Sequence, residues 1–367
     1  MTSNPTSAPS VADVEVRRGQ ELLEAGEIEP AREAFERAID LQPDHVLAAV
    51  GLAQALLAEG AFTDAKDLYE AAFAAGLEKS ARHLTNLGIC YAFEGERPTA
   101  RTLIEGAIAT DPNYEPAYGA LARHCVIMGD HRAAERYATE GLRLFPVNLP
   151  CREARALARL AMLNLDAAAA DAESALQLDP QSVDALQCKA AVLLARQQVG
   201  PALEVLQQAE SIAPDDAEVL LSAGSAHQIV GDFEAAEERF QKAREFEPAN
   251  WRVYQALAAL ALVREEAAAG LEHVDLALEL QDAPVLHYLR GALLRLEGRD
   301  GEAKEEFKRA TQASPIDALS WVELAELEAR VPAERAAAIE HARAAERLDP
   351  EGEVGKRSRR VRADLGA

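Results

Sequence analysis

The sequence is organised by a period of 34 residues. Prolines recur at this spacing along the middle of the chain, and an alanine stands twelve residues before each of them. The prolines are Pro112, Pro146, Pro180, Pro214 and Pro248, and the alanines are Ala100, Ala134, Ala168, Ala202 and Ala236. A fixed period of this length predicts a stack of small structural repeats rather than a single hydrophobic core.

The residue types at the repeated positions favour a pair of helices in each repeat. Small residues let two helices approach closely, and an aromatic residue such as Phe35 or Phe240 fills the space beside them. Most repeats carry a central glycine, for example Gly231, which suits the left-handed conformation that ends a helix. The closing proline marks the end of the second helix, because proline disfavours helix in the residue before it.

This pattern resembles the tetratricopeptide repeat, whose consensus is W-x2-L-G-x2-Y, then A-x3-F, then P. The seventh unit shows the resemblance in Leu220, Gly224, Ala236, Phe240 and Pro248. The resemblance implies an all-α fold, a right-handed superhelical solenoid of helix–turn–helix repeats. We expect an array of about ten units over residues 12–350, with starts near residues 12, 46, 81, 115, 149, 183, 217, 251, 284 and 318.

Three repeats depart from the pattern at the turn between their two helices. Glycine is replaced by Leu163-Asn164 in the fifth unit, by Gln197-Gln198 in the sixth and by Glu265-Glu266 in the eighth. The second helix of the fifth unit is also rich in alanine, which buries little apolar area. Two interpretations of this region remain open. The middle of the array is its least stable part, or the alanines are present simply because alanine is a good helix former.

Two segments flank the array. Residues 1–11 are expected to form a disordered N-terminal segment, and their sequence has neither the basic nor the apolar region of a secretory signal. Residues 351–367 carry a net charge of +2, and Val354, Val361 and Leu365 recur at helical spacing. We expect these residues to form a basic capping helix whose arginines face water, or else a basic tail that docks an acidic partner.

The net charge of −24 restricts the classes of partner. An acidic chain repels phosphate backbones, so nucleic acid is not an expected ligand. No stretch approaches the ~18 consecutive apolar residues of a membrane span, so membrane insertion is not expected either. The expected location is the cytoplasm.

The sequence contains no recognisable catalytic or metal-binding motif. The four cysteines Cys90, Cys125, Cys151 and Cys188 are widely separated and form no Cys-x-x-Cys pair. We interpret them as buried, reduced thiols that act as small apolar residues, although Cys90 and Cys125 occupy neighbouring places in successive repeats. We therefore expect no enzyme activity, no cofactor and no metal.

The resemblance implies that the first helix of each unit lines a concave groove. Carried onto this chain, the groove positions of the second to fourth units, with one neighbouring amide, predict nine partner-binding residues: Gln54, Leu57, Arg82, Thr85, Asn86, Ile89, Phe93, Arg123 and Ile127. This mixture of apolar, amide and cationic side chains suits an extended or helical peptide. The alternative is that several of these residues only pack between repeats.

The predicted function is a non-catalytic scaffold or adaptor that binds a peptide or a partner protein in the groove, as a chaperone or an assembly factor. The alternative is an accessory or regulatory subunit of an enzyme whose catalytic chain is separate. The family's clamp for a terminal carboxylate is not supported, since only Asn86 matches it. The identity of the partner and the oligomeric state are left open by the sequence.

Overall fold

The structure, a computed structural model, describes residues 9–367. These residues form twenty-one α-helices and one short 3-10 helix, with no strand among them. The predicted all-α fold of helix–turn–helix repeats is confirmed. The chain divides into two compact units, and the boundary along the sequence falls between Val192 and Leu193. Each unit is described by itself. Residues 1–8 of the predicted disordered N-terminal segment lie outside the described residues.

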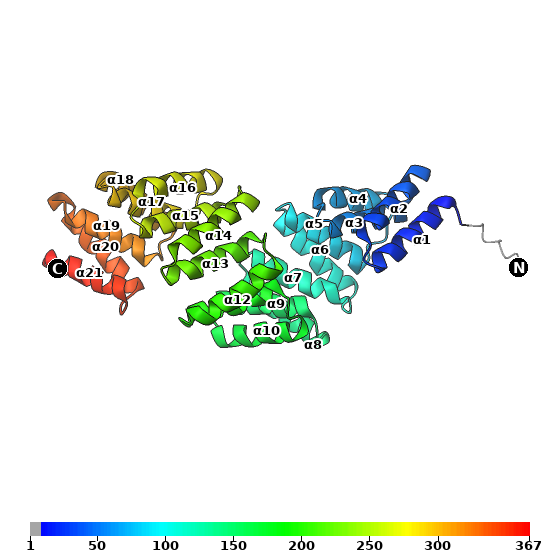
Figure 1. Cartoon of the computed structure of the whole chain (residues 1–367), viewed down its shortest axis with the longest axis horizontal. Coiled ribbons are helices and arrows are strands. Elements are labelled where there is room, and N and C mark those ends of the chain that lie inside the picture. Colours follow the sequence, from blue (N-terminus) through cyan, green and yellow to red (C-terminus); the bar gives the residue numbers. More distant parts are fainter. Residues whose placement is uncertain (1–8) are drawn as a thin grey trace, which may run out of the picture. The chain divides into compact units, whose positions relative to one another are not determined.

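In unit 1, odd-numbered helices are the first helices of successive pairs and even-numbered helices are the second (Figure 1). The first helices are α1 (Val11–Glu24), α3 (Val46–Ala58), α5 (Ala81–Phe93), α7 (Glu115–Ile127) and α9 (Leu149–Ala161). The second helices are α2 (Ile28–Leu41), α4 (Phe62–Ala74), α6 (Arg97–Thr110), α8 (His131–Leu144) and α10 (Leu165–Leu178). Helix α11 (Val183–Ala195) begins in this unit. The first helices of unit 1 also contact one another, α3 with α5 and α5 with α7, so they share one face of the stack.

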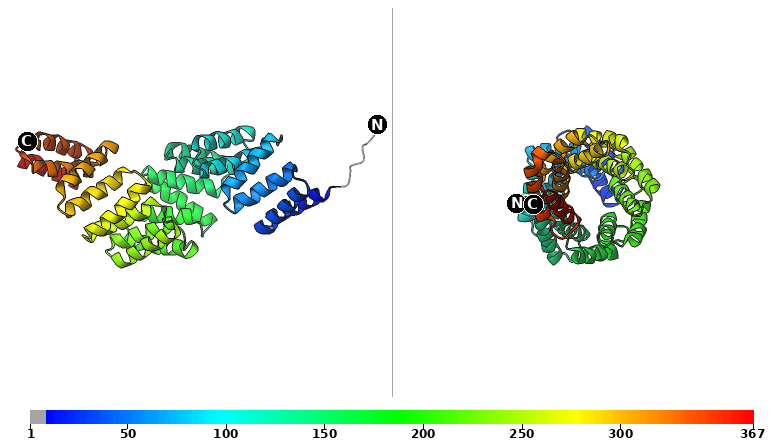
Figure 2. Two further views of the ribbon diagram at one scale, coloured as in Figure 1. Left: turned by 90° about the horizontal axis from the view of Figure 1, so that it is seen from above. Right: turned by 90° about the vertical axis from the view of Figure 1, so that its left-hand side faces the viewer.

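Unit 2 continues the alternation of first and second helices, and the helices of each pair pack against each other, as the green to orange part of the left view of Figure 2 shows. Its second helices are α12 (Val199–Ile212), α14 (Phe233–Phe246), α16 (Ala267–Leu280), α18 (Asp300–Ala313) and α20 (Arg335–Leu348). Its first helices are α13 (Ala217–Ile229), α15 (Trp251–Val263), α17 (Pro284–Leu296) and α19 (Ala318–Ala329). The 3-10 helix η1 (Pro332–Glu334) precedes α20, and α21 (Glu353–Asp364) follows it.

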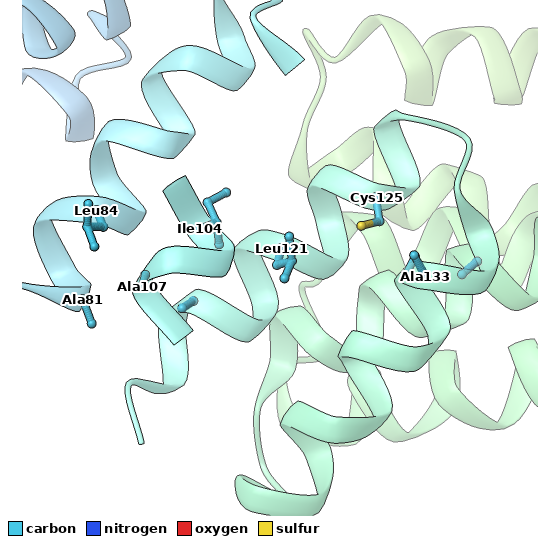
Figure 3. Close-up of a cluster of buried hydrophobic side chains, with 10 residues drawn as sticks. Ala81, Leu84, Ile104, Ala107, Leu121, Cys125 and Ala133 are labelled. Atoms are coloured by element: carbon cyan, nitrogen blue, oxygen red, sulfur yellow. The ribbon is translucent and has the colours of Figure 1, made fainter. Parts of the chain in front are cut away.

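The repeated small residues lie at the closest contacts between helices. The alanines at the position of Ala236 in the sequence period are completely buried, namely Ala31, Ala65, Ala100, Ala134, Ala168, Ala202, Ala236 and Ala303. One of these alanines, Ala134, belongs to a cluster of buried residues from helices α5 to α9. Ile104, Leu121 and Cys125 belong to the same cluster (Figure 3). The cores are therefore local to neighbouring helices, as the sequence period predicts.

The turns inside the repeats keep one backbone conformation with and without glycine. Gly26, Gly60, Gly95, Gly129, Gly231 and Gly298 have positive φ angles between 72° and 83°. Leu163, Gln197 and Glu265 adopt the same region, with φ angles of 59°, 61° and 60°. The three departures in the sequence thus change the residue at the turn and not its geometry.

Helix α21 packs against α19 and α20 through one apolar face. Val361 is buried against Ala325 and Ala342, and Leu365 lies at the edge of this cluster. The prediction that the arginines of this segment all face water is wrong. Arg357 donates hydrogen bonds to Glu323 and Glu326 of α19, and Arg362 donates one to Glu346 of α20. Carboxylates of α19 and α20 supply these partners, so the positive charges of α21 help to hold it in place.

Candidate functional site

A cavity of unit 1 lies on the face formed by its first helices. Its volume is about 750 Å³, within the ~300–1,000 Å³ of small-molecule and peptide side-chain sites. Helices α1 and α3 contribute most of its walls, while the start of α5 and the link between α6 and α7 complete them. We call this the concave cavity, and its lining residues are Gln20, Leu23, Glu24, Leu47, Val50, Gly51, Gln54, Ser80, Ala81, Arg82, His83, Asp111 and Tyr114.

The concave cavity combines an apolar base with hydrogen-bonding groups at its sides. Val50 is almost fully buried and packs into the core between α3 and α5. Gln54 stands one helical turn farther along α3 and leaves part of its side chain accessible. Arg82 is exposed beside Tyr114, and burial raises the pKa of the Tyr114 phenol while the Arg82 charge opposes the rise. The lining therefore offers amide, guanidinium and phenol groups around an apolar surface.

A buried hydroxyl supports the α3–α5 side of this region. The ring of Tyr69 on α4 is completely buried, and its hydroxyl accepts a hydrogen bond from the Asn86 side chain at 2.8 Å. Burial raises the pKa of Tyr69, and contacts with Asn86 and Gln54 act in the opposite direction. Asn86 thus holds Tyr69 in place, which is a positioning role between adjacent repeats.

The structure brings only two of the nine predicted residues, Gln54 and Arg82, into the lining of the concave cavity. Thr85 is a correction, because it is 1% exposed and its hydroxyl donates to the carbonyl oxygen of Ala81 at 2.8 Å. Because its side chain is buried, Thr85 has almost no surface that a partner could contact. Leu57 is partly buried against the cluster between α3 and α5, and Ile89 is also half-buried.

Arg123 is engaged within unit 1. Its guanidinium pairs with Asp184 of α11 and lies 3.5 Å from Glu153 of α9. Glu153 is 8% exposed and accepts a hydrogen bond from Ser182 at 2.6 Å. Burial raises the pKa of Glu153 above its usual range. Arg123 therefore bridges the first helices of three successive repeats. The position of Arg123 within its own repeat does not reveal this arrangement.

Phe93 and Ile127 are exposed, but they lie at the C-terminal ends of α5 and α7 and outside the lining of the concave cavity. Phe93 instead stacks on Phe62, the first residue of α4. The structure therefore separates Phe93 from Gln54 and Arg82, and a role for Phe93 in partner binding stays a prediction. The position of Phe93 within its repeat did not indicate the contact with Phe62.

Sequence reasoning also missed several lining residues. Gln20 of α1 belongs to the cavity, although the predicted site began at the second repeat. Leu47 of α3 lies within the second repeat but is not one of the nine predicted residues. Tyr114 enters from a link between repeats, where no groove position is defined. The only sequence signal was that Gln20 and Gln54 occupy equivalent places in consecutive repeats.

Two buried carboxylates, Asp171 and Glu306, pair with an arginine on the first helix of the same repeat. Arg155 of α9 donates two hydrogen bonds, of 2.8 and 2.7 Å, to the buried carboxylate of Asp171 on α10. Arg290 of α17 meets Glu306 of α18 in the same way at 2.8 Å, again sixteen residues along the chain. Because both pairs occupy the same place in their repeats, we interpret them as packing contacts and not as acid–base groups.

The four cysteines are buried, in agreement with their interpretation as small core residues. Burial raises the pKa of Cys90 to about 11 and the pKa values of Cys151 and Cys188 to about 12. Such thiols are poor nucleophiles and poor metal ligands near neutral pH. Among residues 9–367, no helix is long and apolar enough to cross a membrane.

Comparisons with known proteins agree with the repeat fold. A sequence profile described as "Tetratricopeptide repeat" matches residues 16–76. A protein named "Protein CTR9 homolog" from Arabidopsis thaliana is 32% identical over 106 residues, which is 29% of this chain. The match spans only 10% of that relative's length.

Solved structures resemble the chain over a larger part of its length. A tetratricopeptide repeat protein from Parabacteroides merdae has a TM-score of 0.52 at 17% identity, covering 67% of this chain and 98% of its own. Cut9–Hcn1, an APC/C hetero-tetramer, gives 0.54 at 14% identity, with 96% of each chain covered. Yeast Tom70 gives 0.52 at 14% identity, covering 97% of this chain and 88% of its own. With the repeated helix pairs, these likenesses show that the chain has the fold of tetratricopeptide-repeat proteins, and the profile match identifies such repeats within residues 16–76.

Proposed function

We propose that this tetratricopeptide-repeat chain is a non-catalytic scaffold that binds a peptide segment of a partner protein in the concave cavity. The observation that carries the proposal is the cavity of about 750 Å³ on the first helices of unit 1. It has the size and the mixed lining of a recognition site, and its polar groups come from secondary structure that the core holds in place.

The chemistry of the lining favours a peptide over a small charged ligand. Leu23, Leu47 and Val50 offer apolar contact to one or two side chains. Gln20 and Gln54 each carry a donor and an acceptor, which suits the N–H and carbonyl groups of a peptide backbone. Arg82 adds a cation near Tyr114 and can pair with a carboxylate of the bound segment.

A role in assembling a larger complex, as a chaperone or an assembly factor, is part of this proposal. It is supported by the occurrence of a similar fold in the Cut9–Hcn1 hetero-tetramer. The cytoplasmic location and the lack of nucleic-acid binding that the sequence suggests stay predictions.

A comparison of two double variants tests the proposed site. Gln54→Ala with Arg82→Ala removes an amide and a cation from the concave cavity. Gln177→Ala with Arg132→Ala removes the same side chains from exposed positions on α10 and α8 and serves as the matched control. Circular dichroism should show equal helicity for both, because all four residues lie outside the fully buried core.

Affinity capture from the native cell, followed by mass spectrometry, then supplies the readout. We expect that the wild-type chain and the control variant capture the same partner proteins. The Gln54/Arg82 variant should fail to capture some of them. Equal recovery of every partner by the three proteins would contradict the proposed site. If the captured fraction instead contains an enzyme whose activity changes on adding the chain, the accessory-subunit alternative is correct.

A further inference from the structure

A second apolar surface lies at the edge of unit 1 where the two helices of each repeat are joined. Phe62 begins α4 and Phe93 ends α5, and their rings lie 3.6 Å apart between centroids at an angle of 6°. Phe93 is nevertheless 66% exposed. One face of the pair therefore contacts protein while much of Phe93 is in water. We call this location the unit 1 turn edge.

The unit 1 turn edge is hollowed next to the two rings. A cavity of about 260 Å³ is lined by the turn residues Gly60 and Ala61, by Phe62 and Phe93, and by the polar residues Thr63, Asp64 and Glu94. The hydrogen bond from Lys66 lowers the pKa of Glu94, so that carboxylate is ionised at neutral pH. The surface thus joins an aromatic wall to an acidic rim.

Unit 2 contains the same arrangement at the same place in the sequence period. Phe233 begins α14 and Val263 ends α15, as Phe62 begins α4 and Phe93 ends α5. A cavity of about 580 Å³ is lined by these residues together with Ile229, Val230, Ser225, Gln228 and Gly231. Ile229 is 60% exposed, and Val230 and Val263 are each 52% exposed. We call this the unit 2 turn edge.

The repeat fold does not require apolar side chains at these positions. At the corresponding place farther along unit 2, Asp300 begins α18 and pairs with Arg330, the residue that follows α19, at 2.6 Å. An exposed ion pair therefore closes the same edge there. Large apolar side chains that remain mostly in water at the other two places contribute little to folding, and such patches mark interaction surfaces.

The charge of the chain indicates what covers these surfaces. The two units carry 29 acidic against 17 basic residues and 33 acidic against 21 basic residues, so each has a formal net charge of −12. A cationic segment is attracted to both units. A second copy of this chain would bring equal negative charge to the contact and would be repelled.

We propose that the turn edge of each unit docks a basic amphipathic segment of a partner protein, with an apolar side chain inserted beside Phe93 in unit 1 and beside Val263 in unit 2. In unit 1, cationic side chains of the same segment meet Asp64 and Glu94. The unit 2 cavity has no charged residue in its lining, so the attraction there comes from the net charge of the unit. This surface is separate from the concave cavity, so the inference goes beyond the proposed function.

The test uses a fluorescently labelled synthetic peptide of leucine and lysine, spaced to form an amphipathic helix. A second peptide replaces every leucine by alanine and keeps the charge. Binding to the full chain is measured by fluorescence anisotropy at physiological ionic strength. Because charge alone attracts both peptides, the difference between them reports the apolar contact.

Three variants locate that contact. Phe93→Ala changes the unit 1 turn edge, Ile229→Ala with Val263→Ala changes the unit 2 turn edge, and the triple variant changes both. Arg330→Ala, at the equivalent edge position without an apolar pair, is the matched control. The Gln54→Ala and Arg82→Ala double variant controls for binding in the concave cavity. Circular dichroism checks that each variant keeps its helicity.

We expect the leucine peptide to bind at least ~10-fold more tightly than the alanine peptide, and the triple variant to lose a similar factor. Each single-edge change should lower the amount of peptide bound at saturation, and Arg330→Ala should bind as the wild type does. A loss of binding by the Gln54/Arg82 variant that equals the loss by the triple variant would place the peptide in the concave cavity and overturn the proposal. Equal binding of the two peptides, or unchanged binding by the triple variant, would overturn the proposal. So would sedimentation showing that the wild-type chain self-associates and that Phe93→Ala makes it monomeric, because the occupant would then be a second copy.

Discussion

The ring of Phe240 on α14 lies directly against the α-carbon of Gly224 on α13. A Cβ atom added to Gly224 would stand 2.4 Å from Cε1 of that ring, closer than any ordinary contact. Phe240 is completely buried between α13, α14 and α15, so the ring has no free space into which to move. The glycine and the aromatic residue of the sequence pattern are thus two halves of one contact.

Gly224→Ala should therefore destabilise unit 2 by ~1–3 kcal/mol, the usual cost of overpacking a core. Gly301→Ala in α18 is the matched control, because nothing lies within 4 Å of its added Cβ atom. The control should be neutral or more stable by up to ~1 kcal/mol, since alanine is the better helix former. Urea unfolding followed by circular dichroism measures both. Equal stability of the two variants would mean that the Phe240 ring yields easily.

Helix α21 leads to a prediction that separates capping from docking. If α21 covers the end of unit 2, deleting residues 354–367 exposes Ala325 and Ala342 and should lower the melting temperature. Val361→Ala should destabilise by about 2 kcal/mol because it empties part of the same contact. Lys356→Ala is the control on this helix, since its side chain is mostly exposed. An unchanged melting temperature after the deletion would favour the docking alternative.

Glu153 makes stability depend on pH. Burial raises its pKa in the folded chain, so the folded state binds more protons than the unfolded state between the two pKa values. The free energy of unfolding then falls as pH rises from the usual glutamate pKa through the raised one. Glu153→Gln removes this loss and still accepts the Ser182 hydrogen bond. We expect the variant to be more stable than the wild type at neutral pH and nearly equal to it at about pH 4.

Melting curves from about pH 4 to about pH 8 test this dependence. Glu173→Gln on the exposed side of α10 is the control, because its carboxylate remains largely in water beside Lys189. A wild type more stable than Glu153→Gln at neutral pH would show that attraction between Glu153 and Arg123 exceeds the cost of burying the carboxylate.

The sequence predicts the fold far better than it predicts the site. The period of 34 residues reports contacts that every repeat makes, such as Gly224 with Phe240, and those contacts determine which helix faces are buried. The site depends on contacts that differ between repeats. Thr85 occupies a groove position but is buried by the local approach of α5 to its neighbours.

The longer-range pairs explain the remaining errors at the site. Arg123 reaches Asp184, which is 61 residues away, and no repeat position specifies that partner. Phe93 ends α5 and its ring stacks on Phe62 at the start of α4, and no repeat position specifies that contact either. Gln54 and Arg82 do line the concave cavity, and their role in binding a partner stays a prediction.

The turns without glycine yield the last prediction. Glu265 holds a φ angle of 60° between α15 and α16, where Gly231 holds 80° in the preceding repeat. A side chain in this left-handed region costs ~1–2 kcal/mol in crowding between Cβ and the backbone. Glycine avoids that cost but loses more freedom on folding, by ~0.5–1 kcal/mol. Glu265→Gly should therefore stabilise unit 2 by a net ~0.5–1 kcal/mol.

The reverse change at Gly231 provides the matched comparison. An added Cβ atom there meets nothing within 4 Å, so Gly231→Ala changes only the backbone preference and not the packing. It should destabilise by ~0.5–1 kcal/mol, opposite in sign to Glu265→Gly. Both variants are measured by urea unfolding under one set of conditions, and both report on unit 2. Shifts of the same sign would contradict the argument, because they would show that contacts of the Glu265 side chain, rather than its φ angle, control the stability of that turn.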